Sequence, residues 1–438
     1  MPLTAPLVLA LVAQAPPAAS VERPDRDPRI VRLLEAVSEE RLAATLRKLV
    51  SFETRHTLSA TDSPERGIGA ARQWIRDETA RSSPRLQVSF DSHEIPPQGE
   101  RITREVEIRN VMAVLPGRSP RRIYVSGHYD TVARQPEGRF DWSKPDNTAP
   151  GADDDGSGTA LAMELARVFA ESGIDFDATL VFIAFAGEEQ GLVGAKLHAQ
   201  KAEAERLPIE AVLNNDIVGN PTGGNGIVDA ESVRVFSEGP EDSPSRQLAR
   251  FIRRQAALYY PSHQVRLVAR HDRFGRGGDH SAFNQHGFAA VRFSESNENY
   301  ARQHSAADTL EGVSPPYLAR NARVNAAALA AMALAPPAPR TTDEQKRPLL
   351  DRQPSGYDAR LRWAASPGAA GYRIFWREAW TPDWQHELAV GNVTELVLRD
   401  VSIDDFVFGV AAVGPDGHES VVSAYVNPPR REVDIKTK

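Results

Sequence analysis

One apolar run, Val181 to Ala186, most constrains how this chain can fold. It has the length of a strand and ends at Gly187, and continuous apolar runs of this kind are typical of strands buried inside an α/β sheet. Two adjacent acids, Glu188 and Glu189, follow at once. Acids in this position lie where open α/β sheets bind ligands, and two ionised neighbours need a cation or a shared proton. The pair is equally consistent with a solvated loop before a helix, whose N-terminus favours carboxylates in any case.

Strand and helix patterns alternate on both sides of this run. We expect a three-layer α/β fold with a central mixed β-sheet and antiparallel edge strands, covering residues 21–334 as one domain. Periodicity predicts helices over 27–50, 67–80, 157–172, 191–206, 243–259, 280–285 and 315–334. It predicts strands over 86–95, 105–115, 122–127, 178–186, 209–218, 264–268 and 289–293.

The pattern changes after a Pro-rich linker over 335–345. Short alternating segments separated by turn signals predict a small all-β sandwich over 346–430, followed by a tail over 431–438. Trp363, Tyr372 and the run from Phe408 to Val413 resemble a fibronectin type III module. We expect this module to fold independently, away from the chemistry, and the sequence does not indicate its ligand.

Composition narrows the classes of function. The chain of 438 residues has a net charge of -7 and contains no dense block of Lys and Arg, which argues against nucleic-acid binding. It has no cysteine, so disulfides, thiolate zinc sites and cysteine nucleophiles are excluded. Any metal must therefore be held by His, Asp and Glu.

The first 20 residues have the pattern of a signal peptide. An apolar stretch from Ala5 to Ala13 precedes the segment Ala13-Gln-Ala15, which resembles a cleavage site. A disordered tail is the alternative. The run is too short to span a bilayer, and no later apolar run is long enough. We therefore expect a secreted or periplasmic protein with no membrane span.

Residues of metal-binding type occur at five separate places in the larger domain. His128 and Asp130 follow one predicted strand, Glu188 and Glu189 another, and Asp216 a third; the loop with Asp153, Asp154 and Asp155 precedes a helix, and His304 lies in a polar loop. One sheet can direct all five toward one point. Imidazoles and carboxylates without cysteine suit a two-metal hydrolytic site. Taken singly, each histidine is more often a surface or core residue, and the aspartates could form an ordinary turn or helix cap.

Together these segments resemble the co-catalytic zinc aminopeptidases and glutamate-carboxypeptidase-like enzymes of metallopeptidase family 28. The resemblance covers about Asn110 to Leu334 and rests on Ser126-Gly-His-Tyr-Asp130, the loop from Gly151 to Gly158, the Glu188–Glu189 pair, Asp216 and His304. It implies two Zn²⁺ ions: one held by His128 and Asp216, the other by Glu189 and His304, with Asp154 bridging both. It also implies Glu188 as the general base and Asp130 as the residue that orients His128.

The resemblance explains why two glutamates are adjacent, with one binding metal and the other accepting a proton. A base that takes a proton from water must lie beside the metals without being used as a ligand. Gly277 to Phe283 resembles a segment near the family's active site, so Asp279 and His280 are expected to support the ligands from behind. Some relatives have a tyrosine just upstream that stabilises the oxyanion. This chain has Phe274 there, which leaves its oxyanion donor undefined.

The expected activity is that of a zinc-dependent aminopeptidase acting on peptides. A carboxypeptidase of the same family remains an alternative, because Arg273, Arg276 and Arg302 could bind a free carboxylate. A glutaminyl cyclase shares the fold but binds one zinc, which the five-ligand set disfavours. The least favoured alternative is a non-enzymatic protein that acts through its β-module.

Overall fold

The computed structural model describes residues 26–135, 137–352 and 357–426. The predicted signal peptide and the C-terminal tail lie outside these residues. Within the larger domain the helices are α1 (Pro28–Glu35), α2 (Glu39–Val50), α3 (Gly67–Ser82), α4 (Gly156–Glu171), α5 (Val193–Ala204), α6 (Pro244–Tyr259), α7 (His280–Gln285) and α8 (Pro315–Leu334). The strands are β1 (Gln87–Ile95), β2 (Val106–Leu115), β3 (Arg122–His128), β4 (Thr179–Phe185), β5 (Ile209–Asn215), β6 (Ser232–Ser237), β7 (Gln264–Val268) and β8 (Ala290–Glu295).

These strands form one mixed sheet in the order β1-β2-β4-β3-β5-β8-β6-β7. The middle strands β4, β3, β5 and β8 are parallel, whereas β2 pairs with β4 and β6 with β8 in the antiparallel sense. In β4, residues Leu180 to Phe185 are buried, as the apolar run predicts. The expected mixed sheet with antiparallel strands is thus confirmed.

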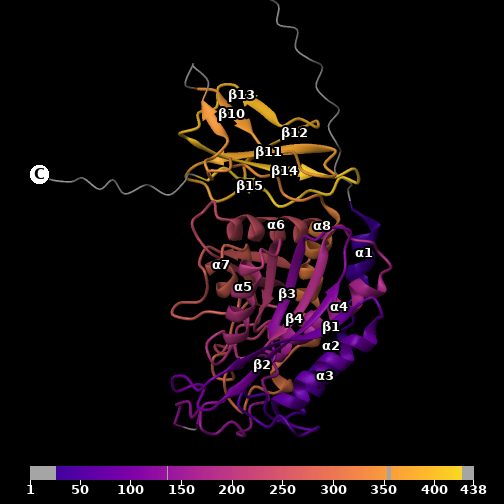
Figure 1. Cartoon of the computed structure of the whole chain (residues 1–438), viewed down its shortest axis with the longest axis vertical. Helices are drawn as coiled ribbons and strands as arrows, with labels where there is room; N and C mark the ends of the chain where they lie inside the picture. The colour runs from indigo at the N-terminus through magenta and orange to yellow at the C-terminus, as the bar shows by residue number, and fades with distance from the viewer. Residues whose placement is uncertain (1–25, 136, 353–356, 427–438) are drawn as a thin grey trace, which may run out of the picture.

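Helices cover both faces of the sheet, which gives the expected three layers (Figure 1). One face packs on α1, α2, α4, α6 and α8 through alternate strand residues such as Val125 and Leu213. The other face packs on α5 and α7 through the intervening residues, among them Tyr124 and Val212. Strand side chains alternate between the faces, so both cores draw on the same buried strands.

Two details differ from the sequence prediction. The single helix expected over 27–50 is two helices, because Ser38 accepts a hydrogen bond from the Arg41 backbone and caps a new helix. Strand β6 was not predicted. Its charged residue Arg234 interrupts the apolar pattern, and in the structure this side chain pairs with Glu298 at 2.6 Å.

The C-terminal strands form two antiparallel sheets. One contains β9 (Leu350–Arg352), β10 (Ala359–Arg362) and β13 (Glu395–Leu398), and the other contains β11 (Gly371–Glu378), β12 (His386–Val390), β14 (Phe406–Val413) and β15 (Ser423–Ala424). Side chains of both sheets, including Leu361 and Ile374, share one apolar core with Trp363. This is the expected β-sandwich, and its likeness to fibronectin type III stays a prediction.

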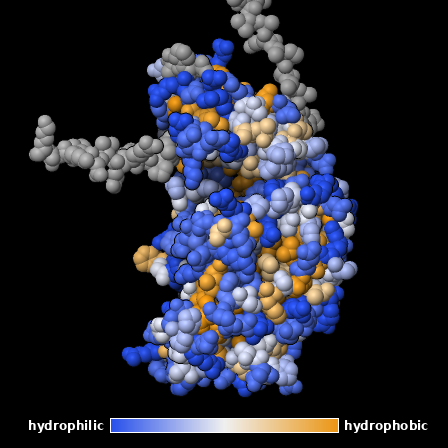
Figure 2. Space-filling model, in the orientation of Figure 1, coloured by the Kyte–Doolittle hydropathy of each residue, from blue (hydrophilic) through white to orange (hydrophobic). Residues whose placement is uncertain are grey.

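The β-sandwich packs directly on the larger domain, at the amino ends of the parallel strands (Figure 1). A cavity of about 290 Å³ at this interface is lined by Glu210 at the start of β5, Ala289 just before β8, and residues 421–424 of the sandwich. The β-sandwich and the larger domain are therefore in contact. Hydrophilic residues dominate the face of the molecule seen in Figure 2. In the part of the chain that the structure describes, no helix is both long and apolar enough to cross a membrane.

Candidate metal centre

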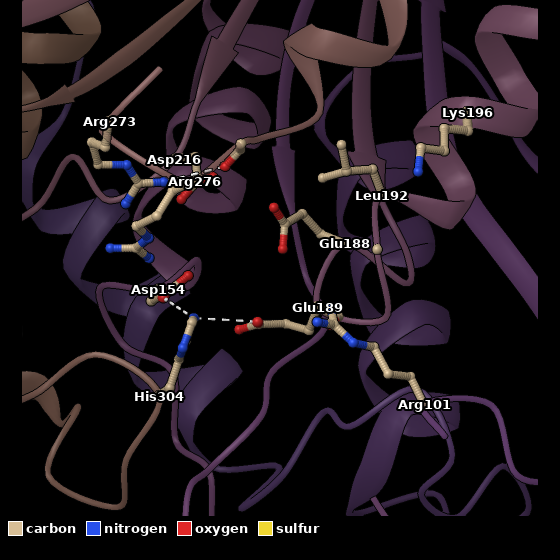
Figure 3. Close-up of a pocket in the computed structure, with 12 residues that line it drawn as sticks. Arg101, Asp154, Glu188, Glu189, Leu192, Lys196, Asp216, Arg273, Arg276 and His304 are labelled. Atoms are coloured by element: carbon tan, nitrogen blue, oxygen red, sulfur yellow. Dashed lines mark hydrogen bonds and ion pairs between the residues drawn. The ribbon is translucent and has the colours of Figure 1, made fainter. Parts of the chain in front are cut away.

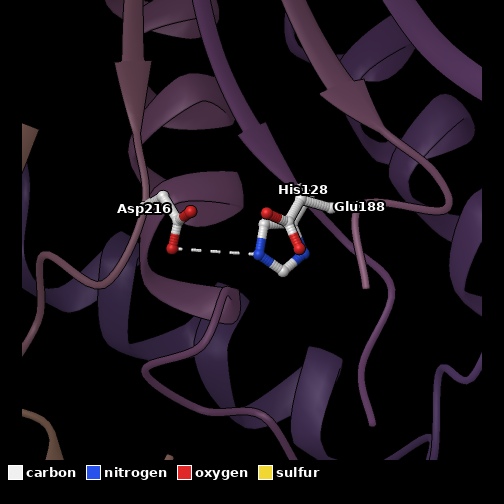
Figure 4. A group of neighbouring side chains, drawn as sticks. All are labelled: His128, Glu188 and Asp216. Carbon is white, nitrogen blue, oxygen red and sulfur yellow. Dashed lines mark ion pairs between the residues drawn. The ribbon is translucent and has the colours of Figure 1, made fainter. Parts of the chain in front are cut away.

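The carboxyl ends of β3, β4 and β5 lie side by side and carry the predicted ligands. His128 ends β3, Glu188 and Glu189 follow β4, and Asp216 follows β5. One potential ligand atom from each of His128, Glu188 and Asp216 lies within 4.8 Å of the others, and Figure 4 shows the three side chains facing one another. Parallel pairing of the three strands is what brings residues so distant in sequence together.

A second group contains Asp154, Glu189 and His304, whose ligand atoms also lie within 4.8 Å of one another. His304 Nε2 is 3.1 Å from Asp154 Oδ2 and 3.2 Å from Glu189 Oε2 (Figure 3). The other oxygen of Asp154, Oδ1, is 3.3 Å from His128 Nε2. Asp154 therefore presents one oxygen to each group, which is the placement a bridging carboxylate needs.

The three consecutive aspartates before α4 have different contacts. The Asp153 carboxylate accepts from the Gly219 backbone at 2.8 Å. The Asp155 carboxylate caps α4 by accepting from Gly158 and also accepts from the His128 backbone at 2.9 Å. Only Asp154 lines the cleft, which agrees with the ligand that the resemblance implies.

Asp130 fixes the turn that presents the two glutamates. Its two carboxylate oxygens accept hydrogen bonds from the backbone amides of Glu188 and Glu189, each at 3.1 Å. The positive φ of Gly187, +72°, allows the sharp turn after β4. With the backbone held in this way, both glutamate side chains line the cleft.

Asp130 also lies beside the His128 ring, and its backbone is closer to the ring than its carboxylate. His128 Nδ1 lies 3.1 Å from the Asp130 backbone carbonyl, whereas the Asp130 carboxylate is 3.6 Å away. An N–H on Nδ1 donated to that carbonyl leaves Nε2 free to bind a metal. The contact at this ring nitrogen thus comes from the backbone carbonyl of Asp130.

Arg292 is a functional-site residue that the sequence analysis did not identify. It lies on β8 with no solvent exposure, and its guanidinium is 2.9 Å from Asp216 Oδ2 and 3.3 Å from Asp272 Oδ2. It thereby holds one oxygen of the predicted ligand Asp216, while Oδ1 faces His128 at 3.9 Å. The sequence did contain a sign of this role, because Arg292 is a charged residue within an otherwise apolar predicted strand. Arginine is rarely buried without a partner, so such a position indicates an ion pair.

The loop of His304 is held by groups that sequence reasoning also missed. Asp308, four residues on, accepts from the backbone amides of Asp153 and Asp154 at 3.0 and 2.9 Å. The His304 carbonyl accepts from the Arg134 backbone at 2.8 Å, and the Phe140 ring lies 5.6 Å from the His304 ring. The loop of His304 is thus held beside the cleft from two sides, by Arg134 and Phe140 and by the backbone of Asp153 and Asp154.

The two residues expected behind the ligands differ in placement. Asp279 is buried, and its two carboxylate oxygens have no hydrogen-bond partner among the residues that the structure describes. Burial, followed by the charge of Glu188, raises the pKa of Asp279 well above its ordinary value. His280 instead places Nε2 2.6 Å from the His271 carbonyl. Phe274 is 86% exposed and stacks on Arg270, so it does not contribute to the cleft.

The donor set fits zinc on its own chemistry. Among the described residues Glu189 Oε1 is buried without a hydrogen-bond donor, and the two oxygens of Asp154 face the histidine nitrogens of the two ligand groups. Buried carboxylates in this arrangement require a cation or a proton. Burial, then the neighbouring charges, raises the pKa of Glu189 well above its ordinary value and that of Glu188 to about 7. Imidazole nitrogens and carboxylate oxygens in two clusters are ligands that zinc accepts.

Comparison with known proteins identifies relatives at two levels. Residues 110–329 match the model of Peptidase family M28. A probable zinc metalloprotease of Pyricularia oryzae is 39% identical over 92% of this chain and 84% of its own length, and one of Pyrenophora teres is 38% identical over 90% and 86%. Because these matches span nine-tenths of the chain, they include C-terminal strands as well as the larger domain.

Solved structures share the fold at lower identity. The LapA aminopeptidase of Legionella pneumophila superposes with a TM-score of 0.53 at 20% identity, covering 72% of this chain and 78% of that one. The glutaminyl cyclase of Porphyromonas gingivalis superposes with a TM-score of 0.52 at 18% identity, covering 67% and 98%. The fold alone therefore occurs with two different reactions.

Proposed function

From the premise that this chain is a zinc metalloprotease belonging to peptidase family M28, we propose that it is a di-zinc aminopeptidase that removes N-terminal residues from peptides. The observation that carries the proposal is the pair of ligand groups joined by Asp154, with Glu188 beside them. His128 and Asp216 would hold one zinc, and Glu189 and His304 the other.

The chemistry divides between the metals and the chain. Zinc bound at these groups would polarise the peptide carbonyl and lower the pKa of a water molecule toward 7. Glu188 is placed to accept that water's proton at its carboxylate and to return it to the leaving amine. Asp130 holds Glu188 and Glu189 at a fixed spacing through their backbone amides, so the proton acceptor and the ligand stay in register.

The free amino group of a peptide would meet carboxylate oxygens that the zinc ions leave unbound in this cleft, with Glu188 among them. Asp154, Glu188, Glu189 and Asp216 all line a cavity of about 380 Å³. Of the arginines that could serve a carboxypeptidase, Arg273 and Arg276 line the same cavity but face Glu298 at 3.0 and 3.5 Å. These contacts favour recognition of the amino end.

The test is release of p-nitroaniline from amino-acid p-nitroanilides, measured before chelation, after chelation and after addition of zinc. We expect activity that chelation abolishes and zinc restores. Metal analysis of the reconstituted protein should approach two equivalents of zinc. A firm plateau at one equivalent, with cyclisation of N-terminal glutamine in place of hydrolysis, would favour the cyclase alternative.

We also propose that residues 1–20 direct export. The support is the apolar stretch followed by Ala13-Gln-Ala15. Mass spectrometry of the protein recovered from the periplasm or medium should find a new N-terminus close to Pro16. An uncleaved cytoplasmic product would contradict export.

A further inference from the structure

Two cations lie where the metal cleft meets a second cavity. Arg101, in the loop between β1 and β2, and Lys196, on α5, line both the 380 Å³ cleft and a neighbouring cavity of about 560 Å³. The second cavity is mainly apolar, with Ile95, Ile102 and Leu197 in its wall. A peptide that places its first residue at the metals would extend past these two cations.

These cations are not committed to carboxylates of the protein. Arg101 donates to the Glu189 backbone carbonyl at 3.1 Å and stacks on Trp142 at 5.2 Å, and for the described residues no ion pair is found for either Arg101 or Lys196. By contrast, Arg273 and Arg276 on the cleft wall both pair with the carboxylate of Glu298. In Figure 3, Arg101 and Lys196 lie on the same side of the pocket, across from Arg273 and Asp216.

The arrangement is partly preorganised for an anion. Trp142 and the Glu189 carbonyl restrain the Arg101 guanidinium, which keeps further N–H donors available. Lys196 is exposed at the rim and adds a mobile donor. Glu100 is the acid among the residues lining the second cavity, and the two cations outnumber it.

We propose that Arg101 and Lys196 bind a carboxylate carried by the second residue of the peptide substrate. The carboxylate is either the side chain of Asp or Glu or the free C-terminus of a dipeptide. The inference rests on the proposed aminopeptidase, and it makes the enzyme selective for acidic or very short peptides. Arg101 and Lys196 are then specificity-determining residues rather than catalytic ones.

The experiment uses four dipeptides and the zinc-loaded Glu188→Gln protein, so that binding is measured without cleavage. Leu-Gln-amide has no carboxylate, Leu-Glu-amide has only the side-chain carboxylate, Leu-Gln only the terminal one, and Leu-Glu both. Calorimetry gives each Kd, and leucine release by the unaltered enzyme gives each kcat/KM. One charge-assisted hydrogen bond should favour a carboxylate-bearing dipeptide about tenfold over Leu-Gln-amide.

Adding Lys196→Gln should lower that preference to about threefold, and adding Arg101→Gln as well should abolish it. Lys201→Gln is the matched control, since Lys201 lies on the same helix, faces Asp91 at 3.3 Å and lines neither cavity. It should leave the preference intact. Whichever single-carboxylate dipeptide binds more tightly identifies the source of the anion.

Equal Kd values for all four dipeptides would overturn the inference, and so would a preference that Lys196→Gln and Arg101→Gln leave unchanged. Leucine release tests the other proposal separately. If the carboxylate preference is present and depends on the two cations, but no leucine is released, then the site stands and the aminopeptidase proposal fails.

Discussion

The two ends of the central sheet are both rich in buried charge, but they handle it differently. At the amino end, Arg121 lies 2.9 Å from Asp177 and contacts Glu210. There Asp242 also pairs with Arg377 of the β-sandwich. At the carboxyl end, the buried Glu189 Oε1 and both carboxylate oxygens of Asp279 have no donor among the described residues.

This contrast distinguishes charged groups that hold the domains together from charged groups that bind a metal. A buried ion pair that is complete contributes to how the domains dock, whereas an excess of buried carboxylates is unfavourable until a cation is bound. The carboxyl end therefore depends on metal, and the amino end does not. Each of the following changes tests one side of that comparison.

Glu188→Gln should have the largest effect on turnover. The amide keeps the size of the side chain but cannot accept the proton, so kcat should fall about 100- to 10,000-fold while KM changes little. The zinc content should remain that of the unaltered protein, as measured by metal analysis alongside kinetics.

Glu189→Gln is the matched comparison at the carboxyl end. It removes an anionic ligand, so zinc content should fall and activity should come to depend on added zinc. If Glu188→Gln is instead the variant that loses zinc while Glu189→Gln stays loaded, the two roles are reversed.

Arg292→Leu should have the largest effect on stability. It leaves the buried carboxylate of Asp216 without its arginine, whereas Asp272 keeps Arg273 at 3.0 Å. Breaking one side of a buried pair typically costs about 3–5 kcal/mol. Urea unfolding of the chelated protein measures the loss. Arg270→Leu is the control, because Arg270 is exposed and stacks on the exposed ring of Phe274. Its free energy of unfolding should stay within about 0.5 kcal/mol of that of the unaltered protein. Equal losses in both variants would contradict the role assigned to Arg292.

Asp242→Asn tests the amino end. Arg377 is 1% exposed, so removing its partner charge should lower the free energy of unfolding by about 1–3 kcal/mol. Turnover should be unchanged, because Asp242 lies at the opposite end of the sheet from the metals. Asp383→Asn removes a half-exposed pair with Arg253 in the same interface and should cost about 0–1 kcal/mol. A loss of turnover in Asp242→Asn would mean that the two ends are coupled.

The smallest effect concerns pH at the same interface. Burial would raise the pKa of Asp27, but hydrogen bonds from Arg29 and then His418 outweigh it and lower the pKa from 3.8 to about 2. A lowered carboxylate pKa stabilises the fold above the unfolded-state value and loses that contribution as pH falls through the folded-state value. The stability difference between the unaltered protein and Asp27→Asn should thus be full above pH 3.8 and shrink toward pH 2. A difference that stays constant over this range would contradict the assignment.

The sequence predicted the parts of the site that follow strands. The alternation of elements placed His128, Glu188 and Asp216 at neighbouring strand ends, and the family motif selected Asp154 among three aspartates. It could not predict Arg292 or Asp308, because their roles depend on contacts between segments far apart in the chain. The contacts that dock the β-sandwich were missed for the same reason: a pattern of alternating residues indicates a sandwich but not which helix it packs against.

The position of the β-sandwich determines how the enzyme is presented to its surroundings. It covers the amino end of the sheet, and Val426, the last described residue, belongs to that side of the molecule. A surface, tag or second protein joined directly after Val426 would be held by the sandwich, with the cleft facing the opposite way. Immobilisation through this end should leave the path of peptides to the metals open.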